Sequence, residues 1–252
     1  MKHERATSRG SKLHLLLALA GLLASFPQVK AQAEPGPGAF NEVDLWAGGF
    51  APAARSDFWY ENSRDYSVAH GDLTSVVFGL DLVRHFDRHN AVMLGLGAGG
   101  RTVSEPSRTL DDGTGAPLEH HLEHLDLSLT ASYVFFPLGT DQKVIPYVGA
   151  GVGLYLGSVQ TYRSKTTSDD CSEDENGDTT CADEYTDLKS SGFTTLGYFV
   201  QAGLEFPVSA KLAVLANGRY TVARANLDGD FKDAHELDLS GAQGAVGFAF
   251  RF

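Results

Sequence analysis

Runs of alternating apolar and polar residues recur along the chain, separated by turn-forming residues. Alternation with a period of two predicts β-strands. We predict eight strands, at residues Phe40–Phe50, Leu73–Phe86, Ala91–Val103, His121–Phe136, Val144–Gln160, Ser191–Phe206, Lys211–Ala225 and Glu236–Phe252. Each run is long enough for the roughly 9 to 11 tilted residues that a barrel strand needs to cross a bilayer.

The connections between the predicted strands are alternately short and long. The short ones are Asp87–Asn90, Pro137–Gln142 and Pro207–Ala210, and the long ones are Ala51–Asp72, Ser104–His120, Thr161–Ser190 and Asn226–His235. Bacterial outer-membrane barrels combine short periplasmic turns with longer external loops. A soluble sandwich has no reason to separate its loop lengths in this way, so the alternation favours a barrel.

The faces of the predicted strands also favour a membrane barrel over a soluble β-protein, which is the competing interpretation. Leucine, tyrosine and phenylalanine alternate with Asp126, Ser128, Thr130 and Ser132 in the fourth strand, and glycines occupy one face of the fifth. A soluble barrel would place its bulky apolar groups inside. After Ala33 no stretch has the roughly 18 consecutive apolar residues of a membrane helix, so any crossing must use strands.

The amino-terminal segment has the features of a cleavable signal peptide. Basic residues precede the apolar run Leu13–Ala24, and the small residues Ala31 and Ala33 provide a cleavage site before Glu34. The alternative is an anchor that stays attached. We therefore assign residues 1–33 to a signal peptide and residues 34–252 to one all-β domain, an eight-stranded antiparallel up-and-down transmembrane β-barrel.

Net charge excludes nucleic acid as an expected partner. The whole chain has a formal charge of −12, and the segment after residue 33, with 15 basic and 31 acidic residues, has a charge of −16. A chain of this charge repels phosphate backbones. Much of the acid lies between Asp169 and Asp187, as expected of one solvated loop.

The final strand ends in Gly-Phe-Ala-Phe-Arg-Phe, and residues Val144–Gly157 read VIPYVGAGVGLYLG. In these segments the chain resembles the small OmpA-, OmpW- and OmpX-like barrels of Gram-negative outer membranes. The resemblance implies an outer-membrane location, among outer-membrane lipid and lipopolysaccharide. It also implies that the barrel-assembly machinery reads Phe248, Phe250 and Phe252 as the assembly signal.

Strand alternation directs five charged residues into the predicted lumen. They are Asp81, Asp126, Glu205, Arg219 and Arg251. Charges away from water must be paired or hydrated. Paired charges, such as Arg219 with Asp126, would form a plug that stabilises the barrel, whereas hydrated charges would form a constriction in a narrow pore.

The third long loop contains two cysteines and many carboxylates. In an oxidising compartment we expect a disulfide between Cys171 and Cys181. Asp174, Asn176 and Asp178 have the spacing of the first ligands of a calcium loop, but Thr179 replaces the required glycine and the final glutamate is missing. The alternatives are a bound calcium ion and a solvated loop, and we assign no metal site.

No sequence pattern specifies catalysis. His120, His121 and His124 are close in sequence, but a strand would place His121 on the opposite face from the other two. We assign no catalytic residue and no cofactor. The sequence predicts a non-catalytic structural or surface-interaction protein that meets any extracellular ligand through its long loops. The alternatives are a porin-like narrow pore for small solutes or ions and, third, a lipid-modifying enzyme.

Overall fold

The computed structural model describes residues 39–56, 58–60, 73–111, 117–173, 179–227, 231 and 236–252, with the backbone alone described at 107–111, 117, 120, 164–173 and 179–187. Residues Pro35–Phe252 form one compact unit. The predicted signal peptide lies outside the described residues. Within them, no helix has both the length and the apolar character needed to span a bilayer.

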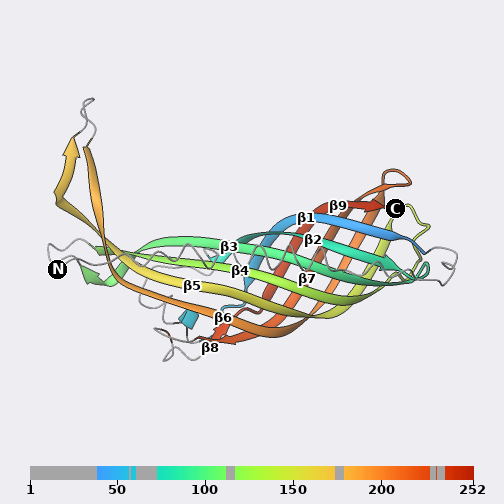
Figure 1. Ribbon diagram of the computed structural model, residues 1–252, viewed down its shortest axis with the longest axis horizontal. Helices are drawn as coiled ribbons and strands as arrows, with labels where there is room; N and C mark the ends of the chain where they lie inside the picture. Colours follow the sequence, from blue (N-terminus) through green and yellow to red (C-terminus); the bar gives the residue numbers. More distant parts are fainter. Residues whose placement is uncertain are drawn as a thin grey trace, which may run out of the picture. The chain divides into compact units, whose positions relative to one another are not determined.

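The described residues form a closed antiparallel barrel (Figure 1). Its strands are β1 (Asn41–Pro52), β2 (Ser75–His85), β3 (Asn90–Asp111), β4 (Pro117–Phe135), β5 (Ile145–Glu173), β6 (Thr179–Pro207), β7 (Leu212–Asn226), β8 (Glu236–Asp238) and β9 (Gly241–Arg251). Neighbours in sequence pair from β1 to β7, and β9 closes the wall between β7 and β1. Because β8 pairs only with β7, the wall has eight strands, and the predicted fold class is confirmed.

Alternation along each strand separates a mixed interior from an apolar exterior. In β6, Leu196, Tyr198 and Val200 are exposed, whereas Phe199 and Gln201 are buried. The same arrangement of apolar residues outside and polar residues inside holds in β4, where Leu125 and Leu129 face outward and Thr130 faces inward. An apolar outer wall on a closed barrel matches a lipid environment, in which each backbone group must be satisfied within the protein.

The three short turns form where they were predicted, through local hydrogen bonds. Asp87 Oδ1 accepts the backbone N–H groups of His89 and Asn90 at 2.7 and 2.9 Å. This arrangement lets an aspartate side chain replace backbone partners in a tight turn. In the β4–β5 turn, Gly139 has a φ of +73°, a backbone conformation that favours glycine.

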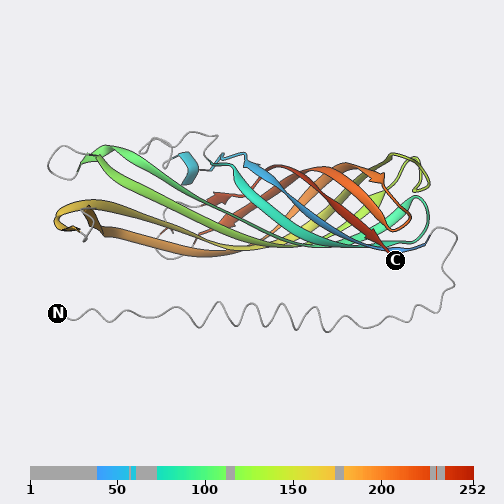
Figure 2. The same ribbon diagram turned by 90° about the horizontal axis from the view of Figure 1, so that it is seen from above.

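Four strands are longer than the sequence pattern predicted. The predicted loops Ser104–His120 and Thr161–Ser190 are largely strand, in the β3–β4 and β5–β6 hairpins. Their sequences are polar on both faces, so they lack the apolar alternation that marks a half-buried strand. These four strands project beyond the closed wall, and we call the projecting part the sheet extension. It begins at residue 101 in β3 and ends at residue 196 in β6. Figure 2 shows both hairpins extending beyond the closed wall, at the end opposite the short turns.

The predicted last strand, Glu236–Phe252, is divided into β8 and β9. The break follows Asp238, whose Oδ1 accepts the backbone N–H of Ser240 at 3.0 Å, while the N–H of Leu239 donates to Ala223 O. The pairing with β7 keeps one register across the break, because Thr221 pairs with Gly241 and Arg224 with Asp238.

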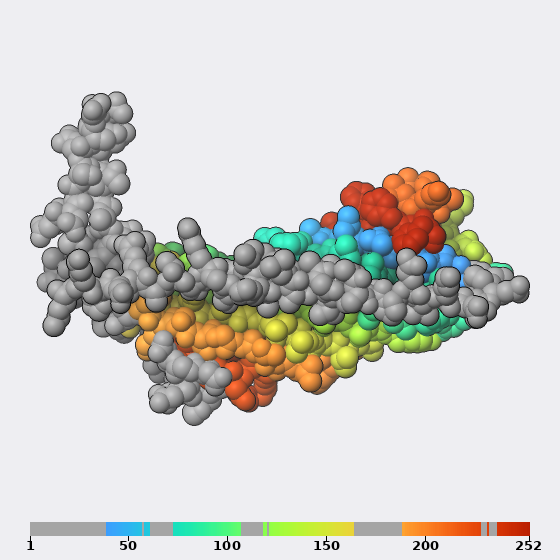
Figure 3. Space-filling model, in the orientation of Figure 1, coloured from blue at the N-terminus to red at the C-terminus, as the bar shows by residue number. Residues whose placement is uncertain are grey.

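The closed wall matches the thickness of a membrane. Strands β2 and β9 each contain 11 residues, which is about the length needed to cross the hydrocarbon region. Pairing between β2 and β3 ends at Val76–Gly100, and pairing between β6 and β7 ends at Gly197–Ala223. Because open sheet edges do not occur in hydrocarbon, the apolar region of the membrane must end near these pairs. In Figure 3 the yellow and orange surface of β5 and β6 continues past the blue and red surface of β1 and β9.

Candidate functional site

The lumen contains aromatic rings that lie over inward-facing glycines on neighbouring strands. Register pairs bring Tyr147 opposite Gly203, Phe199 opposite Gly151, and Phe193 opposite Gly157. A Cβ atom added at any of these glycines would collide with the facing ring. The inward glycines therefore make room for rings, and the space beside the glycine face of β5 is occupied.

Trp46 fills the lumen near the middle of the wall. Its register partners are Gly79 on β2 and Gly247 on β9. Its Nε1 donates a 2.8 Å hydrogen bond to Asp81 Oδ2 in the barrel interior. The indole thus packs on backbone and satisfies one oxygen of a buried carboxylate.

Arg219 faces the same level of the lumen from β7. Its Nη2 donates to Gln201 Oε1 at 3.0 Å, and its guanidinium lies 4.4 Å from the ring centroid of Phe199. Among the residues that the structure describes, Arg219 forms no salt bridge. The salt bridge with Asp126 given above as an example is not formed; an amide and an aromatic face contact the guanidinium instead.

Towards the periplasmic turns, one arginine connects two carboxylates. Arg251 Nε donates to Glu42 Oε2 at 2.7 Å, and its Nη2 donates to Glu205 Oε2. The side chains of Glu42 and Glu205 are 1% and 4% exposed. The Arg251 guanidinium also lies 5.3 Å from the ring centroid of Phe40, which stacks on buried His85. One guanidinium that donates charge-assisted hydrogen bonds to two carboxylates in this way joins three strands, β1, β6 and β9.

A small cavity of about 50 Å³ remains between Trp46 and the mouth of the barrel. Its polar lining includes His124, Asp126, Arg219 and Gln243. A cavity of this volume has room for a few water molecules. His124 Nδ1 also lies 3.8 Å from Oδ1 of Asp126, whose side chain is partly buried.

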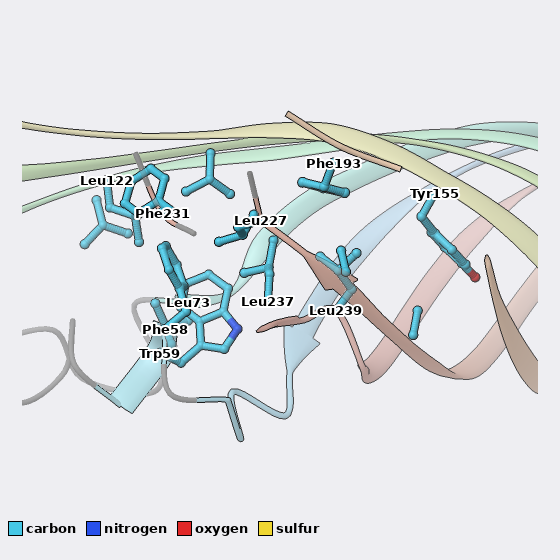
Figure 4. Packing of buried hydrophobic residues seen from close by; sticks show 14 residues of the cluster. Phe58, Trp59, Leu73, Leu122, Tyr155, Phe193, Leu227, Phe231, Leu237 and Leu239 are labelled. Carbon is cyan, nitrogen blue, oxygen red and sulfur yellow. The ribbon is translucent and has the colours of Figure 1, made fainter. Parts of the chain in front are cut away.

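Above this cavity an apolar cluster lies across the mouth of the barrel (Figure 4). We call it the mouth cluster. Its larger members are Phe58, Trp59, Leu73, Val103, Leu122, Tyr155, Val159, Phe193, Leu227, Phe231, Leu237 and Leu239. They come from the first and last external connections and from the inner face of the sheet extension. The two connections thus pack against the extension as a lid on the lumen.

Asp238 holds the two external connections together. Its backbone O accepts Trp59 Nε1 at 2.8 Å, its N–H donates to Ser56 Oγ at 3.2 Å, and its Oδ2 accepts the N–H of Arg55 at 3.2 Å. The Arg101 guanidinium lies 4.4 Å from the Trp59 ring and donates to Leu73 O. Polar bonds therefore anchor the apolar lid at both sides.

The other predicted residues are dispersed. Phe248, Phe250 and Phe252 lie on the outer surface, 52%, 44% and 72% exposed. Cys171 and Cys181 are register partners in the β5–β6 hairpin, but their side chains, like those of the acidic loop, lie outside the described residues. His124 is buried and points inward, whereas His121 contacts Ser104 and stacks on Tyr162. The His120 side chain is not described.

Two inward carboxylates on β1 were missed in the sequence, Glu42 and Asp44. Both are buried, on the face that β1 shares with Trp46. The alternation of Val43, Leu45 and Ala47 with these residues was the available signal. The mouth cluster was missed too: Phe58, Trp59, Leu227 and Phe231 lie outside the predicted strands, and the other members contact them across the mouth from strands distant in sequence.

Fold and lumen together define a small eight-stranded outer-membrane β-barrel. No protein-family model matches the sequence, and no curated protein matches it significantly. Among solved structures, the chain is similar to OprG of Pseudomonas aeruginosa, with 13% identity, a TM-score of 0.50, and coverage of 85% of this chain and 96% of that chain. It also aligns with Ail of Yersinia pestis (16% identity, TM-score 0.43, coverage 85% and 99%) and with Neisserial surface protein A (14%, 0.43, 85% and 99%). The expected resemblance to small outer-membrane barrels is confirmed for the fold.

Proposed function

We propose that this protein is a non-catalytic membrane scaffold with a closed lumen, which presents the sheet extension for contact with an extracellular ligand. The observation that carries the proposal is the filling of the lumen at successive levels. The Arg251 bridge, the ring of Trp46 and the mouth cluster follow one another along the barrel axis. A continuous water path would have to pass all three.

The surface-interaction part of the proposal is supported by the sheet extension. Its β3 edge beyond Gly100 and its β6 edge before Gly197 have no partner strand in the described part of the chain. An unpaired edge presents backbone donors and acceptors that an extended segment of another molecule can use. Near the wall, the inner face of the extension packs on the lid through Val103, Leu122 and Phe193.

Single-channel recording tests the closed lumen. The intact protein is inserted into a planar bilayer, with insertion verified independently by its heat-modifiable mobility on a gel. We expect an inserted, electrically silent barrel. Stable and reproducible current steps would overturn the scaffold proposal.

A narrow pore is the second candidate, and the polar cavity beside Asp126 and Arg219 favours it. The variant Trp46→Ala separates the two. In a scaffold whose mouth cluster and Arg251 bridge still close the path, this variant stays silent. In a pore it raises an existing conductance, because Trp46 would be the narrowest obstacle beside the cavity.

Absence of catalysis requires its own test. The reconstituted protein is incubated with lipopolysaccharide, and the acyl chains of the lipid are analysed by mass spectrometry. We expect no change relative to protein-free membranes. New or missing acyl chains would replace the scaffold proposal with a lipid-modifying activity.

The role of the sheet extension is tested with cells that display the protein. Replacing residues 164–187 by a short Gly-Ser turn removes the far part of the β5–β6 hairpin while leaving the closed wall intact. We expect normal insertion and reduced adhesion to protein-coated surfaces. Equal adhesion by both forms would exclude this part of the hairpin as the contact surface.

A further inference from the structure

The barrel wall has a notch where β6 and β7 separate. Their pairing ends at Gly197–Ala223, and just beyond it Thr195 Oγ1 donates to Arg224 O at 2.6 Å in place of a backbone bond. Beyond this point β7 has no further pairing with β6, while its other edge continues from β9 to β8 in one register. A cavity of about 540 Å³ opens at this point. It is lined by Ala53, Arg55, Leu196, Tyr198, Tyr220, Val222, Ala223, Arg224, Asp238 and Ser240.

The lining of the notch is divided by chemistry. Leu196, Tyr198 and Tyr220 point outward from the wall and are 75%, 60% and 42% exposed. They form an apolar surface that continues the lipid-facing side of the barrel. Arg55 and Arg224 supply two exposed guanidinium groups at the rim, where the open edge of β6 marks the end of the hydrocarbon region. An apolar surface beside cations at this depth complements a lipid with an anionic headgroup.

The acidic residues of the notch leave these cations available. Arg224 Nη1 lies 3.5 Å from Glu236 Oε2, but both side chains are well exposed, so the pair is weak and readily exchanged. Asp238 is buried, and its carboxylate already accepts backbone N–H groups from Arg55 and Ser240. The Arg55 side chain forms no salt bridge among the residues that the structure describes. Guanidinium groups bind phosphate oxygens in a bidentate manner, which favours phosphate over other anions.

We propose that the notch binds a phosphorylated lipid of the outer leaflet, with its phosphate on Arg55 and Arg224 and an acyl chain along Leu196, Tyr198 and Val222. The site depends on the position of the barrel in the membrane. It does not depend on whether the lumen conducts, so it stands or falls separately from the scaffold function.

The test uses the intact protein in phosphatidylcholine nanodiscs and bisphosphorylated lipid A as the probe. Binding is measured by native mass spectrometry as lipid is titrated. We expect the variant Arg55→Gln/Arg224→Gln to bind at least about tenfold more weakly than the wild type, because two charge-assisted contacts are lost. Dephosphorylated lipid A should bind both forms equally weakly.

A matched control removes two cations from the opposite end of the barrel. Arg88→Gln/Lys211→Gln lowers the net charge equally, in the periplasmic turns, and should leave lipid A affinity unchanged. Glu236→Gln frees Arg224 and should tighten binding, which provides a second test if the double variant does not fold.

Three results would overturn the proposal. The first is equal affinity of wild type and the Arg55/Arg224 variant for lipid A. The second is failure of the wild type to distinguish phosphorylated from dephosphorylated lipid. The third is full displacement of lipid A by millimolar inorganic phosphate, which would identify a site for a free anion instead of a lipid.

Discussion

Trp46 and Asp81 form a side-chain pair across β1 and β2, inside the lumen. The indole lies over Gly79 and donates to one carboxylate oxygen of Asp81, whereas the other oxygen, Oδ1, has no hydrogen-bond partner in the described part of the chain. The buried Asp81 carboxylate therefore depends on a single hydrogen-bond donor.

We expect Trp46→Phe to lower the free energy of unfolding by about 1 to 3 kcal/mol, because it leaves a buried carboxylate without its donor. Urea unfolding in lipid vesicles measures the loss. In a double-mutant cycle with Asp81→Leu, the combined variant should lose less than the sum of the single variants, since both polar partners are then absent. Additive losses would mean that the hydrogen bond contributes nothing.

Arg251→Gln should be far more damaging than removal of an exposed arginine. It leaves Glu42 and Glu205 buried without their shared cation, which we expect to cost about 3 to 5 kcal/mol. Arg88→Gln is the matched control, because its pair with Asp141 at 3.0 Å has side chains that are 57% and 63% exposed. That control should cost less than about 1 kcal/mol. Similar losses in the two variants would argue against a stabilising bridge at Arg251.

Inward and outward glycines should respond oppositely to the same substitution. A Cβ at Gly203 would collide with the Tyr147 ring, whereas a Cβ at Gly244 meets nothing within 4 Å. We expect Gly203→Ala to destabilise the barrel by about 1 to 3 kcal/mol through overpacking, and Gly244→Ala to be neutral or slightly stabilising. Thermal unfolding, followed by loss of heat-modifiable mobility, compares them. Equal tolerance at both positions would show that the ring is free to move.

The β2–β3 turn should show an acid-dependent contribution to stability. Hydrogen bonds to the Asp87 carboxyl hold its pKa below its usual value of 3.8. The largest effect comes from the Asn90 side chain, and the next largest from the backbone N–H of His89. The contribution of the Asp87 carboxyl is therefore fully present above the usual pKa and is lost as pH falls through the lower folded pKa. Asp87→Ala should thus destabilise the barrel at neutral pH and have little effect once the wild-type carboxyl is protonated. An NMR titration in which Asn90→Ala does not raise the pKa of Asp87 would contradict this explanation.

Cys171 and Cys181 are expected to form a disulfide in the exported protein. Strand partners have Cα atoms at separations that a disulfide can span. Alkylation without reduction should leave the mass of the intact protein unchanged, and alkylation after reduction should add two labels. Labelling of both cysteines before reduction would show that they are thiols.

Barrel architecture was predictable because the membrane imposes one chemistry on the outside of every strand. Leu196, Tyr198 and Val200 alternate with inward residues, as contact with lipid requires. The same pattern therefore predicts both the strand and the face that it turns to lipid. Connection lengths supplied the topology, since each short turn joins neighbouring antiparallel strands.

The lumen was less predictable, because side chains there meet across strands that are distant in sequence. Inward glycines such as Gly203 do not by themselves show whether the space beside them is filled. At Gly203 the ring of Tyr147, from β5, fills it. A charged residue such as Arg219 was expected to pair with a carboxylate, but its guanidinium contacts Gln201 and Phe199. The mouth cluster was not predicted, because its contacts join the external connections to inward residues of distant strands. The outer part of the sheet extension was not predicted, because its sequence lacks the apolar alternation of a half-buried strand.

In the described strands of the β5–β6 hairpin, acidic residues such as Asp170 and Asp183 lie far along the chain from Gly197 and the notch at Arg55 and Arg224. From Gly197 to Thr179 the chain is continuous strand, a contour of about 60 Å at roughly 3.3 Å per residue. Electrostatic screening in physiological salt acts over about 8 Å. The acidic end of the hairpin and the phosphate-rich surface of the leaflet are therefore separated by several screening lengths. The acidic end of the hairpin can therefore stand above a negatively charged membrane surface without significant electrostatic repulsion between the two.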